Sequence, residues 1–308
     1  MLVFSGTCSP QVAAMTSSWM LVAGALFALV GTLAKLLGNQ FSSAELAMYR
    51  SLIGLLAIGV FLLWRRETIR TAFLRGHFWR GTTGTISLIA SFYAMTHLPL
   101  ALALTLNYTS PIWLTLLSAL LLKERFNARV VFAVALGFIG VAMLLRPAFA
   151  ADQAVAGVVG LASGFFAAFA YLNVKKLGEA GEPAWRVVFY FALVGTFGSA
   201  LTQPLAGEFH PVNGGNVWLL IGIGLFATLA QLAMTRAYHS GSTVVVGAFA
   251  YSTVIFAAIA GVIFFDEQLP PLAWIGMLVI IISGLLAKWG SEAKDRNSKL
   301  PTLPAEED

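Results

Sequence analysis

The sequence predicts an all-α integral membrane protein with ten transmembrane helices, arranged as two inverted five-helix repeats. Three observations predict this fold: the composition, the length of the apolar runs and an internal duplication. Hydrophobic residues make up 58% of the chain and charged residues only 11%, with a mean hydropathy of +0.82. A soluble domain carries about a quarter charged residues. The composition therefore excludes a water-soluble protein and makes the lipid bilayer a partner of this chain.

The apolar runs have the length of membrane-spanning helices. A hydrocarbon core of about 30 Å needs roughly twenty helical residues. In chain order the runs are 19–37, 42–64, 78–96, 100–122, 128–145, 155–176, 184–203, 215–237, 241–265 and 270–289. Because each half holds an odd number of runs, the second half must enter the membrane from the opposite side, as in many secondary transporters.

The two halves repeat the same pattern of residues. The matched positions are Gly24 with Gly164, Lys35 with Lys175, Tyr108 with Tyr251, and Glu124 with Glu267. The predicted repeats are residues 18–146 and 155–289. Residues 1–17 form an N-terminal tail, and the polar segment 290–308, which contains Pro301 and Pro304, is expected to be a disordered cytoplasmic tail.

The distribution of basic residues predicts the orientation. If the N-terminus is cytoplasmic, most of the 19 lysines and arginines fall in inner loops and the C-terminal tail, Arg80 among them. Only Arg146 falls in an outer loop, whereas Lys35 and Arg50 lie inside helices. This asymmetry follows the positive-inside rule and places both termini in the cytoplasm. Anionic lipid headgroups account for the basic pI, so nucleic acid is not an expected partner.

No arrangement of residues predicts catalysis. Cys8 is the only cysteine, and the sequence has no histidine pair at metal-binding spacing and no phosphate-binding GxxxxGK[ST] loop. We therefore expect no enzyme activity, no metal, no cofactor and no direct use of ATP. The oligomeric state is not predicted.

Charged side chains within the predicted helices are candidates for a network or gate, because ions inside a bilayer are costly and usually face a partner or a cavity. They are Lys35, Glu45 and Arg50. Lys35 could instead extend to the headgroups. Arg50 could pair with Glu45, or it could face a cavity and bind an anionic group.

Pro111 predicts a kink in the fourth helix. Proline has no N–H, so it leaves the carbonyl of Asn107 without its helical partner. Asn107, Tyr108, Thr109 and Ser110 would then form a polar platform in the bilayer. The alternative is that neighbouring hydroxyl groups satisfy this carbonyl and the platform has no binding role.

Parts of both halves resemble a known family. The stretches are YAMTHLPLALA from Tyr93, NYTSPI from Asn107 and LKERF from Leu122, with GSTV from Gly241, YST from Tyr251 and FDEQ from Phe265 in the second half. They are similar to EamA domains of the drug/metabolite transporter superfamily. Val254 stands where Pro111 would be expected in the second copy.

The resemblance implies a substrate cavity between the helices. The candidate lining residues are Phe27, Tyr93, Asn107, Tyr108, Tyr171, Asn173, Gln231 and Tyr251. It also implies a secondary transporter of the inner membrane that moves a small organic metabolite by alternating access. An amino acid or similar amphipathic solute, which could be anionic, is the expected substrate, and export is the expected direction. Import of a nucleotide-related metabolite or vitamin is the alternative, and a channel or a non-transporting receptor is the alternative of another class.

Overall fold

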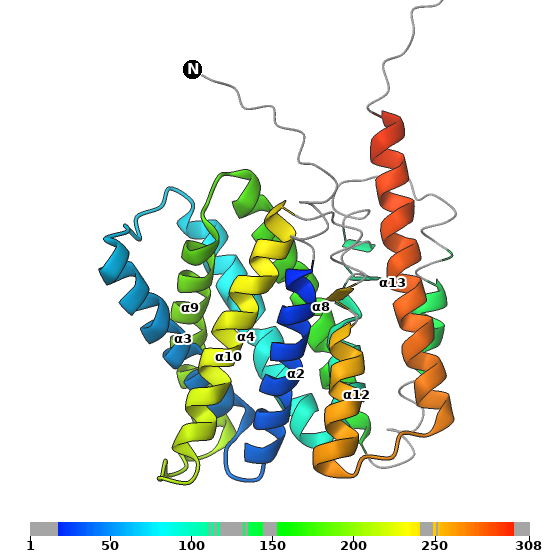
Figure 1. Cartoon of the computed structure of the whole chain (residues 1–308), viewed down its shortest axis with the longest axis horizontal. Coiled ribbons are helices and arrows are strands. Elements are labelled where there is room, and N and C mark those ends of the chain that lie inside the picture. The colour runs from blue at the N-terminus through cyan, green and yellow to red at the C-terminus, as the bar shows by residue number, and fades with distance from the viewer. Residues whose placement is uncertain are drawn as a thin grey trace, which may run out of the picture.

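A computed structural model gives the structure of the protein and describes residues 18–110, 112–113, 116–117, 132, 135–143, 153–240, 249–250 and 252–298. Long helices run side by side in the described part, and the connecting segments gather at the two ends of the bundle (Figure 1). The helices are α2 (Trp19–Leu37), α3 (Ser43–Arg65), α4 (Leu74–His97), α5 (Leu100–Asn107), α8 (Ala154–Glu179), α9 (Ala184–Ala206), α10 (Val217–Ser240), α12 (Ser252–Phe265) and α13 (Pro271–Ser298).

Five of these helices, α2, α3, α8, α9 and α10, are long and apolar enough to cross a membrane. The shorter α12 and the first part of α13 are also apolar. Side chains such as Leu63, Leu201 and Leu205 point outward and are more than 80% exposed. An outer surface of this kind is stable in lipid and not in water. The chain is therefore a multi-pass membrane protein.

The fourth predicted helix is interrupted. We expected it to run from 100 to 122, but α5 ends at Asn107 and the backbone turns at Tyr108 and Thr109. The Thr109 N–H and hydroxyl both donate to the carbonyl of Leu106, at 3.2 and 2.7 Å, so this turn satisfies its own polar groups. The interruption precedes Pro111, which itself lies outside the described residues. A kink was expected in this helix, and the described residues show a break at Tyr108 and Thr109, directly before Pro111.

The end of the last helix also differs from expectation, whereas the start of the ninth is not tested. The ninth predicted helix began at residue 241; residues 241–248 lie outside the described ranges, and the structure describes helical residues 249–250 and α12 from Ser252. The last helix continues to Ser298, beyond the expected end at 289 and into the segment expected to be disordered. Of the fifth predicted helix, 128–145, the structure describes residues 132 and 135–143, and these residues are helical.

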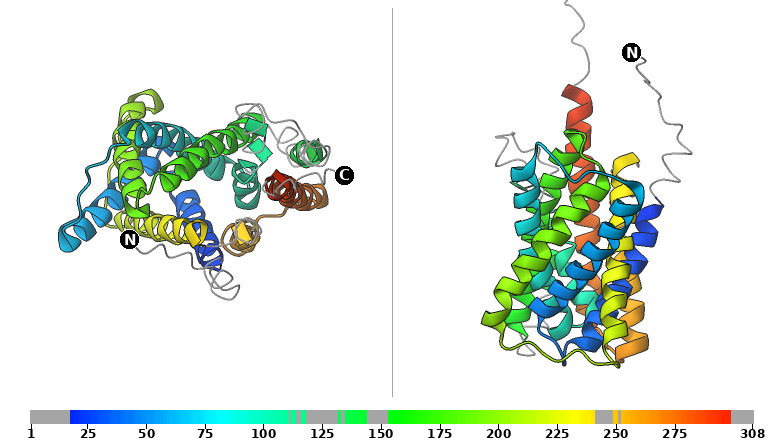
Figure 2. Two further views of the ribbon diagram at one scale, coloured as in Figure 1. Left: turned by 90° about the horizontal axis from the view of Figure 1, so that it is seen from above. Right: turned by 90° about the vertical axis from the view of Figure 1, so that its left-hand side faces the viewer.

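Helices of the two halves of the chain pack against each other. Helix α4 lies against α8 and α9, α3 lies against α9, and α2 lies against α10 and α12. Figure 2 shows these helices interleaved when the bundle is seen from above. Glycines make the close approach possible: a Cβ atom on Gly81 would lie 2.6 Å from Val194, and one on Gly195 would lie 2.6 Å from Ser51. Small residues are the usual means by which membrane helices pack closely.

One contact between the halves occurs twice. A Cβ atom on Gly24 of α2 would lie 2.8 Å from the Thr253 hydroxyl of α12. A Cβ atom on Gly164 of α8 would lie 2.4 Å from the Thr109 hydroxyl, just after α5. Gly24 and Gly164 are matched positions of the duplicated sequence, and so are the segments they touch. A two-repeat layout therefore fits the packing.

Candidate solute-binding cavity

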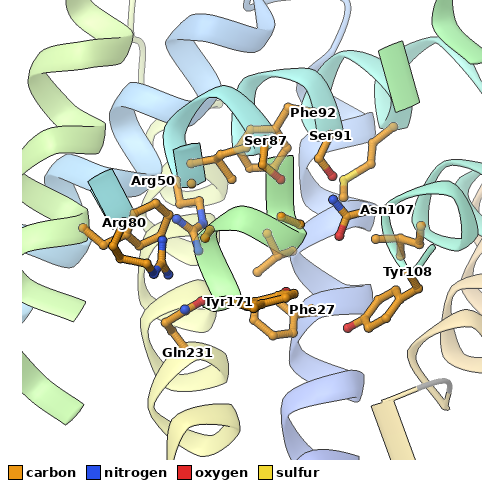
Figure 3. Close-up of a pocket in the computed structure, with 18 residues that line it drawn as sticks. Phe27, Arg50, Arg80, Ser87, Ser91, Phe92, Asn107, Tyr108, Tyr171 and Gln231 are labelled. Atoms are coloured by element: carbon orange, nitrogen blue, oxygen red, sulfur yellow. The ribbon is translucent and has the colours of Figure 1, made fainter. Parts of the chain in front are cut away.

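A cavity of about 110 Å³ lies among α2, α3, α4, α5, α8, α9 and α10, so both halves of the chain form its wall. This volume holds several water molecules or a small organic group. Among the residues predicted from the sequence, those that line it are Phe27, Arg50, Asn107, Tyr108, Tyr171 and Gln231. Figure 3 shows them together with serines of α4.

Three predicted lining residues are not part of the described cavity wall. The ring of Tyr93 stacks on His97 with ring centroids 4.2 Å apart, near the end of α4. The Asn173 amide donates to the carbonyl of Phe169, one turn earlier in α8, at 2.9 Å. The structure therefore gives Tyr93 and Asn173 local partners away from the cavity. Tyr251 lies outside the described residues.

Aromatic rings and neutral polar groups share the wall. Phe27, Phe92 and Tyr171 supply ring surface. At the end of the cavity formed by α5, the Asn107 amide donates to the Ser163 hydroxyl at 3.0 Å. The Tyr108 hydroxyl forms a 2.9 Å hydrogen bond with the Thr253 hydroxyl of α12, in which either group can be the donor. Such a wall suits an amphipathic solute, because rings cover apolar surface and a few fixed polar groups orient the rest.

Two arginines stand at the opposite end of the cavity from Asn107 and Tyr108 (Figure 3). Arg50 comes from α3 and is 8% exposed, and Arg80 comes from α4 and is 3% exposed. Both guanidinium groups face the same ring: their central carbons lie 5.4 Å and 4.1 Å from the centroid of Phe191. This end of the cavity is therefore strongly cationic.

Arg80 was missed by the sequence analysis, which assigned it to an inner loop. Helix α4 begins at Leu74, earlier than the expected residue 78, and this places Arg80 inside the bundle. A signal was present in the sequence. Arg80, Gly84, Ser87 and Ser91 recur at spacings of four, three and four residues, which puts them on one face of a helix. All four line the cavity.

Of the two alternatives for Arg50, a pairing with Glu45 is not found in the structure, and Arg50 faces the cavity. Glu45 is fully buried and is occupied at the start of α3, where its carboxylate accepts from the Ser42 N–H at 2.7 Å and from the N–H and Nδ1 of His210 at 2.7 and 2.8 Å. Five residues of helix separate Glu45 from Arg50, and this spacing turns the two side chains apart. The pattern Ser42-x-x-Glu45 ahead of an apolar run is a capping box, a signal that sequence reasoning could have used.

Lys35 pairs with a carboxylate of the other half of the chain. Its ammonium group contacts the Glu267 carboxylate and donates to the Leu98 carbonyl at 2.7 Å. Glu267 also accepts from the Leu100 N–H, at 2.8 Å for the nearer oxygen, and so caps the start of α5. Lys35, Glu45 and Arg50 thus occupy three separate environments and do not form one network.

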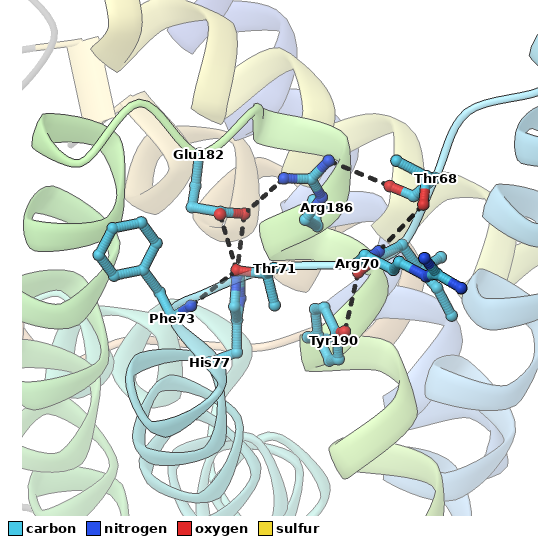
Figure 4. Close-up of polar contacts among 9 residues, drawn as sticks. Thr68, Arg70, Thr71, Phe73, His77, Glu182, Arg186 and Tyr190 are labelled. Atoms are coloured by element: carbon cyan, nitrogen blue, oxygen red, sulfur yellow. Dashed lines mark hydrogen bonds and ion pairs between the residues drawn. The ribbon is translucent and has the colours of Figure 1, made fainter.

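A second polar cluster joins the halves at the end of the bundle expected to face the cytoplasm (Figure 4). Glu182, between α8 and α9, accepts from Thr71 at 2.7 Å and from Arg186 at 3.1 Å, and it lies 3.1 Å from Nε2 of His77. Burial alone would raise the pKa of the Glu182 carboxyl, but hydrogen bonds from Thr71, Arg186 and His77 outweigh it and hold the pKa below its usual value. The cluster fastens the 66–73 segment to the second half of the chain.

These features define a class of protein: a multi-pass membrane protein with a polar and aromatic cavity enclosed jointly by its two halves. The family model of the EamA-like transporter family matches residues 14–146 and 155–288. The chain therefore belongs to the EamA-like transporter family, and it is a membrane transporter of small metabolites.

Several characterised relatives are similar over most of their length. A riboflavin transporter of Vibrio cholerae is 30% identical over 289 residues, which cover 92% of this chain and 96% of the relative. A pseudopaline exporter of Pseudomonas aeruginosa is 30% identical over 257 residues, covering 83% and 90%. A solved structure with 20% identity superposes with a TM-score of 0.61 and covers 90% of this chain and 97% of its own, which supports the fold alone.

Proposed function

We propose that the protein is a secondary transporter of the bacterial inner membrane that exports an amphipathic organic solute, such as an amino acid or a similar metabolite, through the cavity described above. The observation that carries this proposal is the position of the cavity: helices of both halves form its wall, with rings, amides and hydroxyl groups facing the same space. A relative displacement of the halves would change the side from which this space is reached.

The proposed mechanism is alternating access by two inverted five-helix repeats that together span the membrane ten times. The doubled contact of Gly24 and Gly164 supports the repeat relation. Polar clusters tie the halves together at both ends of the bundle, around Glu267 at one end and Glu182 at the other. Each cluster consists of a few hydrogen bonds and ion pairs, which are contacts that can open and re-form as the access side changes.

Import of a nucleotide-related metabolite or vitamin is the second candidate, and one comparison favours a vitamin as the substrate. A relative that matches nearly the full chain is named a riboflavin transporter, whereas another is named a pseudopaline exporter. The aromatic wall of the cavity would also suit a flat vitamin ring. We keep export as the proposed direction of transport, and the flux experiment below tests it against import.

The test is solute flux in liposomes that contain the purified protein. Vesicles loaded with a mixture of isotopically labelled amino acids, nucleotides and vitamins are followed for loss of each label, and the matched experiment places the mixture outside. We expect saturable movement of one solute class that a Tyr108→Ala variant reduces strongly while it still folds. Unsaturable flux that grows linearly with solute concentration would indicate a channel, and binding without flux would indicate a receptor.

Orientation is tested separately with introduced cysteines. Both termini are proposed to be cytoplasmic, so a cysteine at Thr71 or Ser298 should react with an impermeant reagent only from the cytoplasmic side. A cysteine at Asn213, between α9 and α10, should react only from the outer side. Reaction of Asn213 from the cytoplasm would overturn the proposed topology.

A further inference from the structure

We propose that Arg50 and Arg80 form a binding site for an oxyanion group with two negative charges, such as a phosphate monoester or a pair of carboxylates, on a solute whose apolar body lies toward Phe27 and Tyr171. This proposal deepens the proposed function and names the chemical class of the substrate. The binding site does not depend on the proposed function, because binding can be measured without flux; only the claim that the bound solute is transported rests on it.

The first step is that both cations are buried without a carboxylate. Arg50 and Arg80 are more than nine-tenths buried, and the described wall of the cavity contains no aspartate or glutamate. Within the described ranges neither guanidinium forms an ion pair, and Nε and Nη1 of Arg80 have no hydrogen-bond partner. Two positive charges thus face one space, and no described residue of the wall supplies a negative charge beside them.

The contrast with other cations in the protein is informative. Lys35 is paired with Glu267, and Arg186 is paired with Glu182, although both cations are more exposed than Arg80. For both of these cations the fold supplies a carboxylate. A buried charge without a partner is strongly unfavourable. The missing counter-charge at Arg50 and Arg80 is therefore expected to come from a ligand.

The geometry holds the two groups within reach of one ligand. Because both guanidinium carbons are measured to the same Phe191 centroid, at 5.4 and 4.1 Å, they cannot lie farther apart than the sum of these distances. Each cation also gains a favourable interaction with the Phe191 ring. Arg80 is further confined by Gly84, where a Cβ atom would come within 2.2 Å of Nη1. A guanidinium presents a planar fork of donors that matches a carboxylate or phosphate oxygen pair.

The rest of the cavity indicates what the anion is attached to. Phe27 and Tyr171 lie between the arginines and the polar end at Asn107 (Figure 3). A ligand with its anionic group at the arginines would place an apolar or aromatic body along these rings. An amide or hydroxyl at its far end could contact Asn107. A small inorganic anion would leave this ring surface without a contact.

The experiment measures binding to the purified full-length protein by its thermal unfolding midpoint at constant ionic strength. The probes are phenyl phosphate, its monoanionic methyl ester and phenol, which share a ring but differ in charge. Phenylsuccinate tests whether a dicarboxylate binds as well as a phosphate ester. Inorganic phosphate tests whether the anionic group binds without an aromatic ring attached to it. We expect one or both dianionic aromatic probes to raise the midpoint, the ester to raise it less, and phenol and inorganic phosphate to raise it little.

Variants locate the effect. Arg50→Gln and Arg80→Gln should each weaken probe affinity about tenfold or more, since a charge-assisted hydrogen bond contributes at least that factor. Arg75→Gln is the matched control, because Arg75 is exposed on the same helix, five positions before Arg80. Without a probe, the two cavity variants should unfold at or above the wild-type midpoint, because each removes a buried charge that has no partner.

The outcomes are decisive. No stabilisation by any dianion, or equal stabilisation of wild type and both cavity variants, would overturn the proposal. A lowered midpoint of both variants without a probe, together with unchanged probe affinity, would assign the arginines to structure and also overturn it. Dianion binding without flux in liposomes would leave the binding site standing and refute the transporter. Flux restricted to neutral solutes would refute the anion site alone.

Discussion

Glu267 is the residue at which the contact between the two halves can be tested most quantitatively. Its side chain is 9% exposed, and its carboxylate pairs with Lys35 of α2 and accepts from the buried Leu100 N–H at the start of α5. One side chain of the second half therefore holds two helices of the first. Replacing it removes an ion pair and a helix cap together, and two substitutions separate these contributions.

The magnitudes follow from what each variant leaves behind. Glu267→Ala leaves the Leu100 N–H without a partner and the Lys35 ammonium group without a counter-charge, although its hydrogen bond to the Leu98 carbonyl remains, and this should cost about 3–5 kcal/mol of unfolding free energy. Glu267→Gln keeps a carbonyl oxygen for the Leu100 N–H and loses the charge, which should cost about 1–2 kcal/mol. Lys35→Met should cost a similar amount. The double variant Lys35→Met/Glu267→Gln should cost less than the sum, with a coupling energy of about 1 kcal/mol or more.

The assay is unfolding of the purified protein in mixed micelles by a denaturing detergent, followed by tryptophan fluorescence. Lys176→Met is the control, because Lys176 is exposed on α8, and we expect it to change stability by less than about 0.5 kcal/mol. Equal losses for Glu267→Ala and Glu267→Gln would show that the cap contributes nothing. Strict additivity in the double variant would show that the ion pair contributes nothing, and the two results together would refute this account of the contact.

Three further predictions concern the cavity and the opposite end of the bundle. Gly84→Ala should displace the Arg80 guanidinium, because the new Cβ would lie 2.2 Å from it, and should weaken phenyl phosphate binding about tenfold. Gly59→Ala is the control and should leave this affinity unchanged, because nothing lies within 4 Å of its Cβ. Equal affinities of the Gly84→Ala variant and the wild type would contradict the geometry. Tyr108→Phe removes the 2.9 Å hydrogen bond to α12 and should lower the unfolding free energy by about 1 kcal/mol in a denaturing-detergent titration. An unchanged midpoint would contradict this prediction. The lowered pKa of the Glu182 carboxyl contributes stability that is present above the usual pKa of 4.5 and is lost as the pH falls through the pKa of the folded state. Glu182→Gln should therefore reduce the loss of stability at acidic pH. An unaltered profile of unfolding midpoint against pH would contradict this.

The sequence predicted the membrane environment and most helices because both depend on local composition. The apolar run 19–37 became α2 with the same ends, and the run 42–64 became α3 with each end shifted by one residue. The kink expected near Pro111 lies at Tyr108 and Thr109, but the hydrogen bonds that form this turn were not predicted. A run of apolar and hydroxyl residues does not reveal that a threonine side chain will satisfy the Leu106 carbonyl and end the helix there.

The candidate site was predicted in part for a similar reason. Phe27, Asn107, Tyr171 and Gln231 line the cavity, and their role in binding stays a prediction. The charged residues were harder, because pairing depends on which helices meet. The partner of Lys35 lies far along the chain at Glu267, and no local pattern relates them.

Arg80 shows how a strong general rule can conceal a particular residue. A basic residue near the expected end of a helix fits the positive-inside rule, and that explanation is sufficient until the start of the helix is known. The start at Leu74 moves Arg80 inward by more than one turn. Its spacing with Gly84 and Ser87 on one helical face is the feature that distinguishes a cavity residue from a loop residue.

The central claim is that the cavity between the two halves is reached from each side of the membrane in turn. The most direct measurement uses a Cys8→Ser background with one new cysteine at Ser91 in the cavity wall, and impermeant thiol reagents applied to either side of oriented proteoliposomes. Ser199→Cys is the matched control, because Ser199 is also buried but does not line the cavity. The account predicts that the cysteine at Ser91 reacts from both sides, that phenyl phosphate slows both reactions, and that the cysteine at Ser199 does not react. Reaction from one side only, or no faster than at Ser199, would contradict it.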